Sequence, residues 1–146
     1  MPSLSPAARE LLGSARVAHL ATADQYARPH AVPIVFVWRE GILYTPLDRK
    51  PKREDDWHAL RRVRNIETNG RVAVVVDKYD EDWSRLAWVM LEGVATILET
   101  GDERDAAAAL LHEKYAQYET LSLENRPIVR VQIEHASEWS SGKPLP

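Results

Sequence analysis

Six short runs of apolar and β-branched residues are spread unevenly along the chain, and their spacing constrains the fold more than any other feature. We expect strands over residues 16–22, 29–38, 41–45, 71–77, 86–99 and 128–133. Segments with helical patterning interrupt them at 5–13, 55–69 and 102–118. Because helices do not alternate regularly with strands, a doubly wound parallel sheet is disfavoured. The order predicts an α+β, mostly β fold, in which an antiparallel sheet closes into a small barrel and helices cover its gaps.

Individual residues refine these elements. Ser5 can cap the first helix, and the pair Glu40-Gly41 predicts a tight hairpin between the second and third strands. Pro33 removes a hydrogen-bond donor, which places its strand at an edge or a bulge. Gly93, in the middle of the run 86–99, indicates a bulge or a close approach of two backbones. The β-branched run 71–77 is typical of a fully buried strand, and we expect an irregular tail from about residue 136.

Length and composition exclude several classes of protein. The 146 residues are expected to form a single domain, 1–146, and the absence of cysteine rules out thiolate chemistry and disulfides. A net charge of −3 argues against general nucleic-acid binding. The N-terminal residues lack a secretory signal, and no apolar stretch approaches the ~20 residues of a membrane span, so a cytoplasmic protein without membrane contact is expected. The five scattered histidines lack the spacing of metal ligands, so no metal site is predicted.

Positive charge is concentrated in one segment of this acidic chain. Residues 49–64 hold seven basic and three acidic side chains, a net charge of +4. A strand that ends in the hydroxyl of Thr45 precedes a loop with Lys50 and Lys52, and a helix with three arginines follows. Arg61 and Arg64 share a helix face, whereas Arg62 points elsewhere. These donors are suited to a phosphate group, although an exposed basic loop neutralised by Glu54, Asp55 and Asp56 explains the pattern equally well.

Several segments, taken in order, carry a family resemblance: Pro29-His-Ala-Val-Pro33, Leu43-Tyr44-Thr45, Asp48-Arg-Lys-Pro-Lys52, Arg64-Asn65-Ile66-Glu67, Arg71-Val72, Asp77-Lys-Tyr-Asp-Glu-Asp-Trp-Ser-Arg-Leu-Ala-Trp88 and Gly93. Together they resemble the pyridoxamine-phosphate-oxidase-like split-barrel superfamily, in particular its actinobacterial branch of coenzyme F-420-dependent enzymes. The similarity spans about residues 8–140. It implies a six-stranded antiparallel split β-barrel that forms a homodimer, with two flavin-type cofactors at the interface.

The resemblance also implies site residues. The cofactor phosphate would be held by Thr45, Lys50 and Lys52, with Arg61 as a helper from the helix. Aligning backward from the Asn-Ile-Glu block instead assigns that role to Arg61 and Arg62. The strand Pro33-Ile34-Val35 would lie against the ring system. Other candidates near the pocket are also compatible with different roles: Tyr44, Trp83 and Trp88 as pocket walls or core aromatics, and Arg53 and Arg85 at the mouth for the acidic tail of the coenzyme.

The expected function is that of an oxidoreductase that uses coenzyme F-420, a deazaflavin, as hydride donor to a small organic acceptor. No residue stands out as a catalytic acid. Trp88 falls where the oxidases proper place a polar cofactor contact, and this departure weighs against bound FMN. The alternatives are an FMN-dependent oxidoreductase of the same fold, a non-catalytic flavin- or haem-binding protein, and a carrier of the coenzyme.

Overall fold

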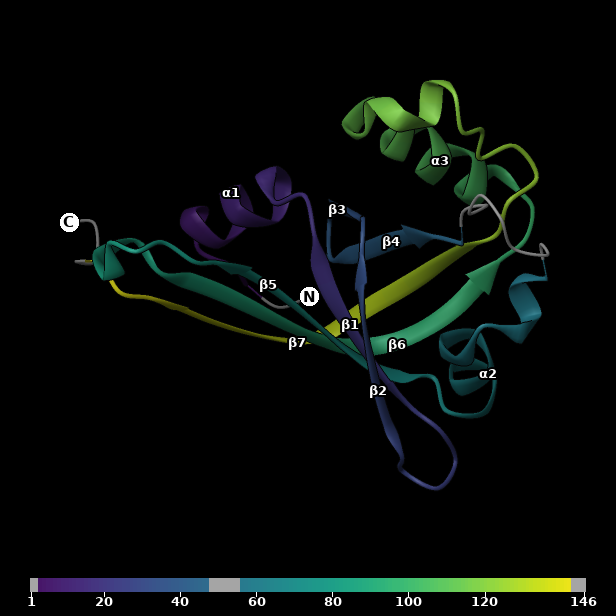
Figure 1. The fold of residues 1–146 in the computed structure, drawn as a ribbon, viewed down its shortest axis with the longest axis horizontal. Helices are drawn as coiled ribbons and strands as arrows, with labels where there is room; N and C mark the ends of the chain where they lie inside the picture. The colour runs from purple at the N-terminus through teal and green to yellow at the C-terminus, as the bar shows by residue number, and fades with distance from the viewer. Residues whose placement is uncertain (1–2, 48–55, 143–146) are drawn as a thin grey trace.

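One antiparallel sheet dominates the computed structural model, which describes residues 3–47 and 56–142. In that part of the chain, seven strands pair in the order β2-β1-β5-β6-β7-β4-β3. Their bounds are β1 (Ala18–Ala23), β2 (Pro29–Ile34), β3 (Val37–Arg39), β4 (Ile42–Pro46), β5 (Arg71–Lys78), β6 (Ala87–Leu98) and β7 (Ile128–Ser140). Figure 1 shows that the sheet is open and strongly curled. The mostly β fold is confirmed, but the prediction of six strands is wrong.

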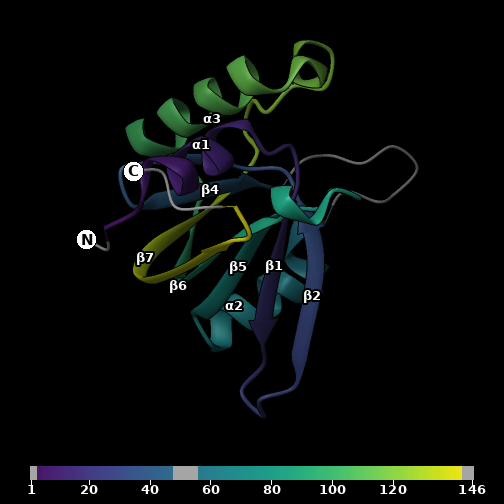
Figure 2. The same cartoon turned by 90° about the vertical axis from the view of Figure 1, so that its left-hand side faces the viewer.

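Three α-helices cover the sheet in the described residues: α1 (Pro6–Ser14), α2 (Arg61–Thr68) and α3 (Asp102–Lys114). In both views α1 and α3 lie above the sheet and α2 lies towards its lower end (Figures 1 and 2). Short 3₁₀ turns are η1 (Trp57–Ala59), η2 (Trp83–Arg85) and η3 (Ala116–Glu119). The Oγ of Ser5 accepts a hydrogen bond from the backbone N of Ala8, which confirms the predicted cap. No helix in these residues is long and apolar enough to cross a membrane.

The expected helices at 55–69 and 102–118 are each shorter than predicted. Leu60 has extended backbone between η1 and α2, with ψ of 132°, so the first segment is a 3₁₀ turn followed by an eight-residue helix. The second ends at Lys114 because Tyr115 is extended, and its apolar stripe continues in η3. In both cases the side-chain pattern persists across a backbone break, since packing requires only that the apolar groups reach the core.

Two hydrophobic cores lie on opposite faces of β4. The larger core fills the inside of the curled sheet and includes Leu12 of α1, Val63 of α2 and Leu43 of β4. The smaller core lies between the sheet and α3 and includes Leu111 and Tyr44. Because consecutive strand residues point to opposite faces, Leu43 and Tyr44 enter different cores. The strand is therefore buried on both faces, and it holds Thr45 at a fixed position.

The seventh strand arises because one predicted strand is interrupted and forms two. The run 29–38 was expected to be one strand, but β2 ends at Ile34 and β3 begins at Val37. β2 pairs only with β1, whereas β3 pairs with β4 at the other edge of the sheet. The chain therefore crosses from one edge to the other within two residues. Pro33 lies on the edge strand β2, as its missing donor predicted.

Two predicted turns are confirmed. Glu40 and Gly41 connect β3 to β4 with φ of 49° and 85°, the left-handed conformations of a two-residue hairpin. The register of β6 and β7 shifts between Glu92 and Gly93. A Cβ on Gly93 would lie 2.0 Å from the carbonyl oxygen of Gln132. Gly93 is thus both a bulge and a close approach of two backbones.

Two strand predictions are wrong. Residues 135–140 belong to β7 and pair with residues 87–92 of β6, so the tail from about residue 136 is not irregular. Its sequence lacks an apolar pattern because most of its side chains are exposed or half-exposed. β5 alternates between buried and accessible residues rather than being fully buried, because only one of its faces lies over the main core.

Candidate functional site

A cleft forms where the two edges of the curled sheet approach each other. Its described lining residues come from the end of β2, the end of β4, the start of β1 and helix α2: Val17, Pro33, Ile34, Val35, Thr45, Pro46 and Arg62. The cleft has a volume of about 170 Å³. Because β3 pairs only as far as Tyr44, Thr45 and Pro46 extend beyond it and face the opposite edge. We call this site the split cleft.

The break after β2 shapes one wall of the split cleft. Val35 lies outside the ladders of both β2 and β3, so its backbone is not part of the sheet pairing. Pro33 has no N–H to offer a neighbouring strand. A wall of this kind presents flat apolar surface together with backbone polar groups, which suits the face and edge of a planar ring.

Phe36 anchors that wall from behind. Its ring is fully buried in the main core. Its backbone N donates to the Oη of Tyr115 at 3.1 Å, and its carbonyl oxygen accepts from the Nζ of Lys114 at 3.0 Å. The same Oη lies 2.9 Å from the carbonyl oxygen of Arg16, and burial raises the pKa of Tyr115. Lys114 of helix α3 and the adjacent Tyr115 thereby fix the segment between β2 and β3.

The polar end of the split cleft consists of a hydroxyl and a guanidinium group. Thr45 is 2% exposed and is held by its pairing with Val129 of β7. Arg62 reaches the cleft from the first turn of α2. A hydroxyl donor beside a guanidinium group matches the requirements of a phosphate, which binds several convergent donors. The described residues therefore combine an apolar wall with a polar end that holds a hydroxyl and a guanidinium group.

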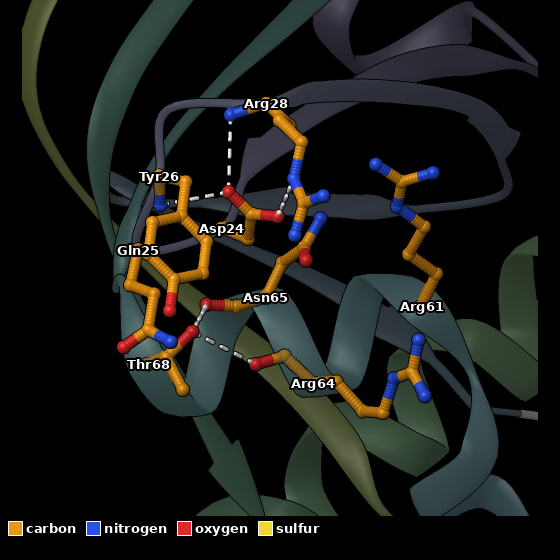
Figure 3. Close-up of a pocket in the computed structure, with 8 residues that line it drawn as sticks. All are labelled: Asp24, Gln25, Tyr26, Arg28, Arg61, Arg64, Asn65 and Thr68. Atoms are coloured by element: carbon orange, nitrogen blue, oxygen red, sulfur yellow. Dashed lines mark hydrogen bonds and ion pairs between the residues drawn. The ribbon is translucent and has the colours of Figure 1, made fainter.

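The structure brings together four of the nine residues expected to bind a cofactor: Pro33, Ile34, Val35 and Thr45 line the split cleft. Lys50 and Lys52 lie outside the described residues, as does Arg53. Arg61 lies on the other face of α2, in a separate pocket with Arg64 (Figure 3). This confirms the helical phase expected from the sequence. Of the two arginines that the backward alignment assigned, Arg61 and Arg62, the structure brings only Arg62 to the cleft.

The aromatic candidates lie elsewhere. The ring of Tyr44 belongs to the smaller core, its Oη donates to the exposed Glu103 of α3 at 2.6 Å, and burial raises the pKa of Tyr44 to about 12. The hydrogen bond from Tyr44, with Arg130 beside it, lowers the pKa of Glu103. Trp88 is an exposed residue of β6 opposite Trp139 of β7 and does not line the cleft of its own chain.

Trp83 and Arg85 lie together in η2, between β5 and β6. Trp83 is exposed, and the Nε of Arg85 lies 3.6 Å from Asp82. Neither residue lines the split cleft. Val17 and Pro46 are lining residues that the sequence did not single out, because only the curl of the sheet brings them there.

Lys114 lies in a different pocket, between α1, β3 and α3, which it lines together with Glu113 and Arg39. Its Nζ lies 4.0 Å from the centre of the Phe36 ring. Burial, reinforced by the charge of Arg16, lowers the pKa of Lys114 to about 8. Among the residues that the structure describes, no carboxylate forms an ion pair with this ammonium group. Its charge is therefore a cost to the folded state at neutral pH.

We expect stability to rise with pH as Lys114 loses its proton in the folded protein. Its unfolded pKa is near 10.5, so between about pH 8 and 10 the unfolded state binds more protons and wild-type stability increases. After discounting for partial exposure, the gain is about 1 kcal/mol. Urea unfolding of wild type and Lys114→Met at pH 7 and pH 9.5 measures it.

The matched control is Lys78→Met, at an exposed lysine in β5. The pH-dependent gain should disappear in Lys114→Met and persist in Lys78→Met; an equal gain in all three proteins contradicts the assignment. Measurements stop below pH 10, because the raised pKa values of Tyr44 and Tyr115 give stability that is lost above it.

No group of three or more potential metal-ligating side chains is present in residues 3–47 and 56–142.

Proteins of known structure with a similar fold support the architecture described above. The haem storage protein HutZ from Vibrio cholerae has a TM-score of 0.72 at 20% identity, with 95% of each chain covered. A conserved hypothetical protein from Mycobacterium tuberculosis has a TM-score of 0.74 at 19% identity, covering 95% of this chain and 86% of that one.

A FAD-binding protein from Mesorhizobium loti is similar at 24% identity and a TM-score of 0.65, covering 92% of this chain and 94% of that one. At these identities the likeness concerns the fold alone. A search of curated protein sequences found no match. The sequence profile described as pyridoxamine 5'-phosphate oxidase matches residues 4–140. The chain therefore belongs to the pyridoxamine 5'-phosphate oxidase-like split-barrel family.

Proposed function

We propose that this protein is an oxidoreductase that binds coenzyme F-420 in the split cleft and transfers hydride to a small organic acceptor. The observation that carries the proposal is the meeting of two sheet edges, which joins the wall of Pro33, Ile34 and Val35 to the hydroxyl of Thr45 and the guanidinium group of Arg62. A bound deazaflavin supplies the hydride chemistry. The chain supplies orientation and a positively charged seat.

Arg62 and Thr45 would hold the cofactor phosphate, with Lys50 and Lys52 as further donors from the segment that follows β4. Charge-assisted hydrogen bonds from a guanidinium group are among the strongest available for this purpose. The wall of β2 would fix the ring through apolar contact and the backbone of Val35. Since none of the described lining residues is an acid or a histidine, any proton needed by the acceptor would come from solvent.

A second copy of the chain would complete the site. A cleft of about 170 Å³ is smaller than the ~300–1,000 Å³ typical of ligand pockets. Val17, which lines it, is 47% exposed, and exposed tryptophans, Trp88 and Trp139, lie on adjacent strands β6 and β7. A homodimer would cover such residues and add a wall. In this arrangement Trp88 would contribute to the wall of the cleft in the other copy.

Haem is the second candidate ligand, because HutZ is a haem storage protein of the same fold. Haem iron requires an axial ligand such as histidine, cysteine, methionine or tyrosine. None of the described residues that line the split cleft is of these types. The donor set therefore favours a phosphate-bearing flavin-type cofactor over haem.

The test is a titration of F-420, FMN and haem against the native protein, followed by tryptophan fluorescence, with the mass of each complex measured by sedimentation. We expect F-420 to bind a dimer, and to bind more tightly than FMN. Turnover is then assayed with enones, nitro compounds and quinones. If FMN binds more tightly than F-420, the proposed cofactor is FMN and not F-420. Tighter binding of haem would overturn the assignment of a flavin-type cofactor. Binding without turnover would favour a carrier of the coenzyme.

Replacement of Arg62 tests the phosphate assignment. We expect Arg62→Gln to weaken binding of FMN and F-420 by about 10–100-fold, the loss of one charge-assisted contact. Arg61→Gln is the matched control, since it removes the same charge from the next residue of α2 but on the other face. The pair Lys50→Ala with Lys52→Ala should also weaken binding. Equal effects of Arg61→Gln and Arg62→Gln on FMN would show that only net charge matters and would reject the assignment.

A further inference from the structure

A second, more polar pocket lies between the β1–β2 turn and helix α2 (Figure 3). It has a volume of about 380 Å³. Its described lining residues come from these two elements only: Asp24, Gln25, Tyr26, Arg28, Arg61, Arg64, Asn65 and Thr68. We call it the arginine pocket. It shares no lining residue with the split cleft, although both use α2.

Arg28 is held in place by the turn itself. Asp24 accepts hydrogen bonds at Oδ1 from the backbone N of Tyr26 and of Arg28, at 2.8 and 3.0 Å. Its Oδ2 accepts from the Nε of Arg28 at 2.7 Å. These contacts lower the pKa of Asp24, with the backbone bond from Arg28 as the largest cause. Because the ion pair uses Nε, the two terminal nitrogens of Arg28 are left directed towards α2 (Figure 3).

Helix α2 contributes two further guanidinium groups. Arg61 and Arg64 are three residues apart, so they project from the same face of the helix. In the described part of the chain, no carboxylate forms an ion pair with either of them. The described lining thus holds three guanidinium groups and one carboxylate, Asp24, a net charge of +2. Neighbouring like charges on a helix are unfavourable unless an anion lies between them.

The floor of the arginine pocket is rigid. Asn65 is 3% exposed, and its Nδ2 donates to the Oγ1 of Thr22 in β1 at 3.0 Å, also buried. The hydroxyl of Thr68 lies 3.2 Å from the carbonyl oxygens of Arg64 and of Asn65. The buried bond between Asn65 and Thr22 fixes α2 relative to the β1–β2 hairpin. The backbone positions that carry the arginines of the two elements are therefore fixed relative to each other without a ligand.

We propose that the arginine pocket is a second anion-binding site, which takes a small phosphate monoester independently of the split cleft. The dianion of such an ester matches the net charge of +2, and planar guanidinium groups bind phosphate oxygens in pairs. The exposed ring of Tyr26 forms a wall against which the organic part of the ester would rest. A nucleic acid is a poorer fit, because the chain as a whole is acidic, with a net charge of −3.

Calorimetric titration with inorganic phosphate and with AMP tests this site. We expect saturable binding of both probes in the wild type, and weakening by about 5–20-fold in Arg64→Gln and in Arg61→Gln. Arg9→Gln is the matched control, since Arg9 is an exposed arginine of helix α1 remote from the pocket. A melting temperature within about 2 °C of wild type shows that each variant is folded.

The split cleft is controlled in the same experiment. Phosphate binding should persist in Arg62→Gln, because Arg62 lines the split cleft and not the arginine pocket. Loss of phosphate binding in Arg62→Gln would place the anion in the split cleft and overturn the second site. Absence of saturable phosphate binding, equal weakening in Arg9→Gln, or displacement by a short RNA that binds more tightly would overturn it as well.

Discussion

Gly93→Ala is expected to lower the free energy of unfolding by about 3 kcal/mol or more. The added Cβ would lie 2.0 Å from the carbonyl oxygen of Gln132, 2.8 Å from its carbonyl carbon and 3.0 Å from the Cα of Ile133. All three atoms are backbone, so no side chain can rotate away. Relief requires β6 and β7 to move apart where their register shifts.

The measurement is urea unfolding of Gly93→Ala beside Gly13→Ala. Gly13 lies in the last turn of α1, and a Cβ there meets no atom within 4 Å. Its replacement should leave stability unchanged or raise it by up to about 1 kcal/mol through helix propensity. A free energy of unfolding of Gly93→Ala within about 0.5 kcal/mol of the wild-type value would be no larger a change than ordinary surface substitutions cause. It would show that the two strands are not in close contact at the bulge.

Phe36→Ala is expected to cost about 3–5 kcal/mol, a large share of the ~5–15 kcal/mol that stabilises a typical domain. The ring is fully buried in the main core. Loss of the ring leaves a cavity directly behind the residues before β3 that form a wall of the split cleft. Both stability and cofactor affinity should therefore fall, because Val35 and the residues before it are no longer supported.

Phe36→Leu keeps the variant folded and makes the second effect measurable. Leucine retains most of the apolar volume and should cost less than about 1.5 kcal/mol. We expect FMN affinity to weaken several-fold in Phe36→Leu while phosphate binding in the arginine pocket stays constant. Val74→Ala, at a fully buried position of β5 away from both sites, is the control for general destabilisation. Equal loss of FMN affinity in that variant would show that Phe36 has no specific role in the wall.

Local structure could be predicted from the sequence wherever it depended on neighbouring residues alone. Ser5 caps its helix, Glu40 and Gly41 adopt the left-handed turn, and Gly93 lies at a bulge. Each of these outcomes follows from the conformational range of one or two residues. The different faces of Arg61 and Arg62 follow equally from the helical repeat.

Strand ends were harder to predict, because pairing partners decide them. The outer half of β7 has few apolar residues, yet it is a strand because β6 supplies its hydrogen bonds. The run 29–38 looks continuous, yet it divides because Phe36 turns into the core and is held by Tyr115. Neither outcome can be found in the segment itself, since the determining contacts are far away in the sequence.

The amino-acid order by itself determined the class of fold, the edge position of Pro33 and the family, and it led to the proposal that Thr45 and a nearby cation bind a phosphate. Only the tertiary structure decided which cation faces Thr45, and it separated the arginines of α2 between two pockets. The physical reason is that a helix fixes the angle between Arg61 and Arg62, but only the curl of the sheet fixes what each of them faces.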